Sequence, residues 1–143
     1  MSATNIADME ITVRRLYEAM NTGDGDLVDA ALTPDWEAIP LLPHTSAGSA
    51  GYRDLIVFLR TVFPDLRVTI EDVVVSGDRA AVRALARGTQ SGELLGIPAT
   101  GRKVEFRAVD FHRVQGGRIA QTWHLEDYFG LLSQLGATFS AAS

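Results

Sequence analysis

The sequence has no cysteine, no strongly basic segment and no long apolar run. Without cysteine, its 143 residues can form no disulfide, thiolate metal site or cysteine nucleophile. A formal net charge of −5 is far from the basic balance of nucleic-acid-binding domains. No stretch approaches the roughly eighteen apolar residues of a membrane span, and the N-terminal residues lack the pattern of an export signal. We therefore expect a cytoplasmic protein without a nucleic-acid or membrane partner.

Several motifs of common enzyme classes are also missing. The chain has no histidine cluster at metal-ligand spacing, no phosphate-binding glycine loop and no Gly-x-Ser-x-Gly sequence. The segment 96–101 (GIPATG) is rich in glycine, but it contains proline and no Lys-Ser or Lys-Thr follows it. We interpret it as a turn. The sequence thus predicts a protein that uses neither a metal nor a cofactor.

The first part of the chain has the apolar spacing of helices. Met9, Val13, Leu16 and Met20 recur on one helical face. A second stripe of apolar residues at helical spacing lies over 52–63 and ends before Pro64. The pattern predicts a helix ending near residues 21–25, a short helix over 26–32, an extended segment over 36–39, a loop over 40–49 and a helix over 52–63.

The second part has the alternation and turn residues of strands. It predicts strands over 66–75, 79–88, 103–114 and 118–125, paired as two hairpins, with a break over 92–101 and a short amphipathic helix over 128–135. Helices followed by hairpins favour an α+β fold, in which helices pack on one face of a curved antiparallel sheet. We expect a single domain over residues 1–136 and a frayed tail over 137–143.

The second hairpin carries the titratable residues that could do chemistry. Alternation puts Asp110 and His112 on one face of the strand 103–114, with Phe106, Ala108 and Val114. On the partner strand, Ala120, Thr122, His124 and Glu126 share one face, and Ile119, Gln121, Trp123 and Leu125 share the other. A loop over 116–118 would set Asp110 opposite His124 and His112 opposite Thr122, whereas a loop of Gly116 and Gly117 alone would shift this register by one. The residues themselves leave both registers open.

A carboxylate beside an imidazole can move protons. Such a pair can remove a proton from a carbon next to a carbonyl, and neutral donors such as Thr122, Tyr17 and Gln90 could stabilise the enolate oxygen. His112 could instead face the mouth of a pocket or a neighbouring subunit. A solvated surface, or a buried pair that only holds the hairpin together, is the alternative interpretation.

Six segments together resemble the SnoaL-like polyketide cyclases of the nuclear-transport-factor-2-like superfamily. They are residues 16–24 (LYEAMNTGD), 63–68 (FPDLRV), 96–101 (GIPATG), 104–119, 123–128 (WHLEDY) and 131–136 (LLSQLG). The resemblance implies a cone-shaped domain with a deep apolar pocket, the register that sets Asp110 beside His124, and a dimer or tetramer built through the outer face of the sheet.

The resemblance also implies a reaction. In these cyclases an acid on the last strand removes a substrate proton, an intramolecular aldol reaction closes a ring, and a histidine on the neighbouring strand assists. Here His124 stands at the acid's position and Asp110 at the histidine's, so the pair is kept with its members exchanged. Ile39 and Gln90 also stand where histidines are frequent in the family.

We therefore predict an enzyme that cyclises or isomerises a small apolar carbonyl compound, with Asp110 and His124 as the catalytic pair. The predicted substrate-binding residues are Tyr17, Trp36, Ile39, Phe63, Gln90, Ala108 and Thr122. A homodimer, or a tetramer, is expected because Val109, Phe111, Trp123 and Leu125 make the outer face apolar.

Other functions stay open at this point. The same pocket could hold a ligand without catalysis, or its own side chains could fill it in an assembly domain. Activity like that of limonene epoxide hydrolase would need an arginine where Ala108 stands. Activity like that of ketosteroid isomerase would use Tyr17 and a second buried acid, and no such acid is evident in the sequence.

Overall fold

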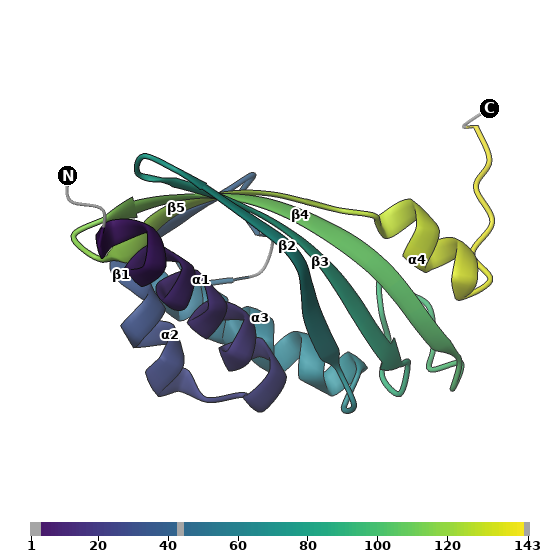
Figure 1. Cartoon of the computed structure of the whole chain (residues 1–143). Coiled ribbons are helices and arrows are strands. Elements are labelled where there is room, and N and C mark those ends of the chain that lie inside the picture. The colour runs from purple at the N-terminus through teal and green to yellow at the C-terminus, as the bar shows by residue number, and fades with distance from the viewer. Residues whose placement is uncertain (1–3, 43–44, 142–143) are drawn as a thin grey trace.

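The computed structural model describes residues 4–42 and 45–141 (Figure 1). The described residues form four helices and five strands, in the chain order that the sequence predicts. In chain order the elements are α1 (Thr4–Thr22), α2 (Gly25–Ala31), β1 (Leu32–Ile39), α3 (Ser49–Val62), β2 (Arg67–Ser76), β3 (Arg79–Thr89), β4 (Lys103–Gln115), β5 (Arg118–Glu126) and α4 (Tyr128–Gln134).

The helices α1, α2 and α3 cover one face of the curved sheet, and α4 lies apart at the far end beside β4 (Figure 1). The predicted stripe of α1 is buried at Val13, Leu16 and Met20. The helix α3 ends before Phe63, because a residue that precedes proline is driven out of the helical conformation. A curved sheet covered by helices on one face is the predicted α+β cone.

The strands are ordered β1-β5-β4-β3-β2. The neighbours from β2 to β5 are antiparallel, but β1 runs parallel to β5, so the expectation of a wholly antiparallel sheet is wrong at this edge. The strand β1 is also longer than the predicted segment 36–39, because it starts at Leu32 directly after α2. Pro34 lies where the pairing with β5 is interrupted, and an edge strand tolerates its missing N–H.

Next to the turn between β4 and β5, the strand β5 contains a bulge that could not be predicted from the sequence. Gly116 and Gly117 both have positive φ and make a two-residue turn, with Val114 paired to Ile119. The next pair joins Arg113 to Gln121, so Ala120 is an extra residue on β5.

The bulge restores the register that a two-residue turn alone would shift. Asp110 pairs with His124 and His112 with Thr122, as the family resemblance implied. The bulge also turns Ile119 into the core, where it is fully buried. Its predicted place on the outer face with Trp123 is therefore wrong.

No helix among residues 4–42 and 45–141 combines the length and the apolar character that a membrane crossing requires. After α4, the chain turns at Gly136, and the described residues that follow have no regular structure. The Phe139 ring of this tail stacks on Phe129 with ring centroids 4.8 Å apart.

Candidate active site

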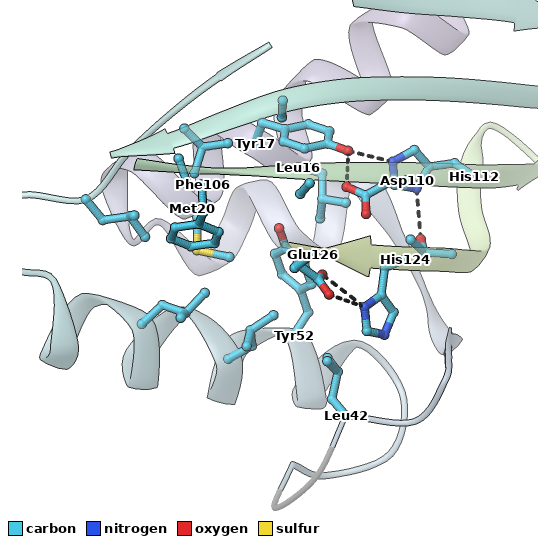
Figure 2. A pocket seen from close by; sticks show the side chains of 18 of the residues that line it. Leu16, Tyr17, Met20, Leu42, Tyr52, Phe106, Asp110, His112, His124 and Glu126 are labelled. Carbon is cyan, nitrogen blue, oxygen red and sulfur yellow. Dashed lines mark hydrogen bonds and ion pairs between the residues drawn. The ribbon is translucent and has the colours of Figure 1, made fainter. Parts of the chain in front are cut away.

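A cavity of about 100 Å³ lies between the helices and the inner face of the sheet (Figure 2). Most of its wall is apolar, with Leu16 and Met20 from α1, Leu55 and Leu59 from α3, and Phe106 from β4. The polar side chains gather on β4 and β5 and on the elements that face them. They are Tyr17, Trp36, Tyr52, Asp110, His112, Thr122, His124 and Glu126. A cavity of this kind argues against an assembly domain with a filled interior.

Asp110 projects from β4 into this cavity. Its Oδ2 accepts a hydrogen bond from the Tyr17 hydroxyl at 2.6 Å. Burial raises the pKa of Asp110 to about 6, while the hydrogen bond from Tyr17 acts in the opposite sense. The carboxylate is therefore ionised at neutral pH, yet basic enough to accept a proton from a substrate.

A chain of hydrogen bonds runs behind this carboxylate (Figure 2). His112 Nε2 lies 2.9 Å from the Tyr17 hydroxyl and His112 Nδ1 lies 2.8 Å from Thr122 Oγ1, which accepts a further bond from Trp36 Nε1 at 3.0 Å. Burial lowers the pKa of His112 to about 3, so its ring is neutral.

The direction of each bond in this chain follows from its ends. The indole of Trp36 can only donate, and the Tyr17 proton goes to Asp110. His112 must then donate from Nε2 to the Tyr17 oxygen and accept the Thr122 proton at Nδ1. Each of these side chains donates its hydrogen to a neighbour, and the chain of hydrogen bonds holds Tyr17 in place against the Asp110 carboxylate.

His124 has acceptors at both ring nitrogens. Its Nδ1 lies 2.9 and 3.0 Å from the two carboxylate oxygens of Glu126, and its Nε2 lies 2.7 Å from the carbonyl oxygen of Pro40. Only the doubly protonated ring can donate to both sides. The hydrogen bond to Glu126 raises the pKa of His124 above its ordinary value, although partial burial opposes it. In this arrangement His124 is a cation without a free lone pair.

Asp110 and His124 are therefore neighbours with different partners. They face each other across β4 and β5. No hydrogen bond joins the two side chains in the described structure, because Tyr17 holds one and Glu126 the other. The His124 cation still acts through space and lowers the pKa of Asp110. The predicted pair is thus a carboxylate beside a cation.

The structure brings most of the predicted site residues together. Those that line the cavity are Tyr17, Trp36, Ala108, Asp110, Thr122 and His124.

The other three predicted residues, Ile39, Phe63 and Gln90, do not line this cavity. Strand alternation turns Ile39 to the face opposite Trp36. Phe63 is fully buried in the core, where it packs against Phe106 and so closely against Gly88 that a side chain there would collide with it.

Gln90 serves the loop after β3 instead of the cavity. Its amide nitrogen donates to the carbonyl oxygens of Gly92 and Ile97, and its amide oxygen accepts from the backbone and the hydroxyl of Thr100. This fully buried side chain thereby folds the predicted break over 92–101 onto the end of the strand.

Sequence reasoning missed three members of the site. Glu126 was on the correct strand face, and its spacing of two residues from His124 was the available signal. His112, expected at the mouth of a pocket or against a neighbouring subunit, is fully buried beside the cavity. Tyr52 was part of the apolar stripe of α3, and nothing in the sequence distinguished it from a core residue. Among residues 4–42 and 45–141, no group of three or more acidic or histidine side chains is placed to hold a metal ion.

The fold and the site define a class of protein in which helices pack over a curled sheet and enclose an apolar cavity that contains a carboxylate. The family model described as SnoaL-like polyketide cyclase matches residues 10–135, and the chain belongs to this family.

The chain is 29% identical over 124 residues to nogalonic acid methyl ester cyclase of Streptomyces nogalater, covering 85% of this chain and 92% of the relative. It is 29% identical over 128 residues to the aklanonic acid methyl ester cyclase DauD of Streptomyces sp. (strain C5), covering 87% and 79%. Among solved structures, TsrD from Streptomyces laurentii superposes with a TM-score of 0.87 and 33% identity, over 96% of this chain and 99% of that one.

Proposed function

We propose that this protein is a polyketide cyclase that closes a ring by an intramolecular aldol reaction, with Asp110 as the base. The observation that carries the proposal is the ionised, partly buried carboxylate of Asp110 in an apolar cavity of a chain that belongs to the cyclase family. Its curated relatives are named as methyl ester cyclases, which supports a substrate of the same class.

The contacts of His124 favour Asp110 as the base. Both ring nitrogens of His124 donate to oxygen, so this side chain has no lone pair for a substrate proton. Asp110 has only Oδ2 engaged by Tyr17, and its other oxygen accepts no hydrogen bond from the described residues. Of the two residues that the sequence left undecided, Asp110 is the one that can accept a proton.

The reaction needs no partner beyond the substrate. Asp110 takes a proton from the carbon beside a carbonyl, and the C–H electron pair forms the enolate. The enolate carbon attacks a second carbonyl of the same molecule, which makes the new C–C bond and leaves an alkoxide. The protonated Asp110 then returns its proton to that alkoxide. The product is an isomer of the substrate, and the carboxylate is regenerated.

The charges in the cavity favour an ester over a free acid. Asp110 is ionised, and the His124 cation is already paired with the Glu126 carboxylate. A substrate carboxylate would therefore enter an apolar cavity without an unpaired cation to meet it, which costs several kcal/mol. We expect the methyl ester to bind at least tenfold more tightly than the corresponding acid.

We further propose a homodimer that forms through the outer face of the sheet. The side chains of Val109, Phe111 and Leu125 are 41%, 55% and 74% exposed and adjoin Trp123 across β4 and β5. An apolar patch of this kind is typical of an interface. Light scattering should give twice the 15.5 kDa mass of the chain, and the mass of one chain would contradict the dimer. The cytoplasmic location stays a prediction.

The test is turnover of nogalonic acid methyl ester, followed by chromatography and mass spectrometry. We expect an isomer of unchanged mass, and Asp110→Asn should lower kcat by about 10²–10⁴, the usual contribution of a general base. An Asp110→Asn variant that forms the isomer at the wild-type rate would contradict the proposal. Saturable binding without any reaction would favour a binding protein.

A further inference from the structure

Tyr52 is a buried tyrosine whose hydroxyl has no partner among the described residues. The residue is only 8% exposed, and it lines the cavity. Buried hydroxyl groups are almost always hydrogen-bonded, so an exception calls for an explanation. In the described part of the chain, Thr33 Oγ1 is the side-chain polar atom that is both inaccessible to solvent and without a hydrogen-bond partner. The Tyr52 hydroxyl also lacks a partner but is not inaccessible in this way, so it opens on the cavity.

The position of the Tyr52 ring is fixed. It projects from the first turns of α3 and packs edge-on against the Trp36 indole, with ring centroids 5.6 Å apart and planes at 90°. Figure 2 shows its hydroxyl inside the cavity, on the side of Asp110 and Glu126. Burial raises the pKa of Tyr52, so the phenol keeps its proton and can donate.

The other donors of the cavity are committed. Tyr17 donates to Asp110, the Thr122 hydroxyl to His112, and the Trp36 indole to Thr122. The two N–H groups of His124 go to Glu126 and Pro40. Tyr52 is thus the cavity residue that keeps an uncommitted donor within the described structure.

The proposed reaction needs one such donor. When Asp110 takes the substrate proton, the carboxylate becomes neutral and its negative charge moves to the enolate oxygen. An enolate in an apolar cavity is costly unless a hydrogen bond meets its oxygen, and a donor placed in advance is worth a large factor in rate.

We propose that the Tyr52 hydroxyl donates a hydrogen bond to the substrate carbonyl oxygen that becomes the enolate oxygen. This rests on the proposed aldol function. The proton stays on Tyr52, and the bond strengthens as the oxygen gains charge and weakens when the carbonyl re-forms. The substrate is then held with its ketone oxygen toward α3 and its acidic carbon toward β4. Tyr52 is a catalytic residue in this arrangement.

The test is Tyr52→Phe, which keeps the ring that packs on Trp36. We expect kcat with nogalonic acid methyl ester to fall about 10²–10³-fold, as when one oxyanion donor is removed. KM should change much less, because the bond is strongest in the transition state. Tyr128→Phe is the matched control, since Tyr128 does not line the cavity, and it should behave as the wild type.

A second measurement requires no turnover. Acetophenone labelled with ¹³C at the carbonyl is titrated to saturation and followed by NMR. A donated hydrogen bond moves the carbonyl resonance downfield, so wild type and Tyr128→Phe should share a downfield shift that Tyr52→Phe loses.

The outcomes distinguish a failure of the role proposed for Tyr52 from a failure of the proposed aldol function. If Asp110→Asn abolishes turnover but Tyr52→Phe matches the wild type in kcat and in the carbonyl shift, the role of Tyr52 is wrong and the aldol function stands. If Asp110→Asn turns over normally, the proposed base is wrong, and the carbonyl shift alone then decides whether Tyr52 meets a ketone.

Discussion

Removing the Tyr17 hydroxyl should make Asp110 a base that works only at higher pH. Tyr17→Phe deletes the 2.6 Å hydrogen bond to Oδ2, which opposes the effect of burial on the pKa of Asp110. A hydrogen bond to a charged group contributes roughly 1.5–3 kcal/mol, and 1.36 kcal/mol corresponds to one pKa unit. The pKa of Asp110 should therefore rise from about 6 by roughly 1–2 units.

The assay for this prediction is the pH dependence of kcat/KM, which reports the pKa of the base in the free enzyme. Because the base acts when ionised, the acidic limb of the profile should move to higher pH in Tyr17→Phe. Near pH 6 the variant should lose about 5- to 50-fold in activity, and most of the loss should disappear above about pH 9. Tyr128→Phe is the control. An unchanged acidic limb, or one that moves to lower pH, would refute this account of the base.

Three further predictions concern residues around the base. Asp110→Asn should be more stable than the wild type at pH 7, by on the order of 1–3 kcal/mol. The pKa of the Asp110 carboxyl is raised on folding, so this group stabilises the native state at a pH below its unfolded pKa of about 4. This contribution is lost as the pH rises through the folded pKa of about 6. Denaturant melts that show a less stable variant at pH 7 would oppose this. Glu126→Gln should remove the stability that the raised pKa of His124 provides. This stability is present at a pH below the unfolded pKa of about 6.5 and is lost as the pH rises through the folded pKa. Thermal melts should thus separate this variant from the wild type most near pH 6 and least at alkaline pH, whereas a constant difference would contradict the ion pair. Deletion of Ala120 removes the bulge and joins Ile119 directly to Gln121, so Arg113 should still pair with Gln121 and Asp110 with His124. A folded deletion variant should therefore turn over substrate at close to the wild-type rate, and a variant that folds but is inactive would count against this register.

The elements of this fold could be predicted because their signals are local. The stripe of α1 and the alternation of the strands mark a buried face directly in the sequence. The parallel edge pair of β1 and β5 could not be predicted in this way, because their residues lie far apart in the chain and Pro34 argues against a strand at that point.

The site was only partly predictable for a related physical reason. Alternation placed Asp110, Thr122 and His124 on inner faces, but the register depends on the bulge at Ala120, which leaves no mark in the pattern. Gln90, which was expected in the cavity, serves a loop, and Tyr52, which was expected only in the apolar stripe of α3, lines the cavity. A buried amide can serve a loop as well as a ligand, and an aromatic residue on a helical stripe resembles any core residue until its hydroxyl is found in a cavity.

The central claim is that Asp110, and not His124, removes the substrate proton. Hydrogen–deuterium exchange at the enolisable carbon of nogalonic acid methyl ester in D₂O, followed by NMR, measures this step apart from ring closure. The wild type should catalyse the exchange, Asp110→Asn should slow it by about 10²–10⁴-fold, and His124→Gln should retain most of it. Exchange that survives in Asp110→Asn and disappears in His124→Gln would contradict the account and make the imidazole the base.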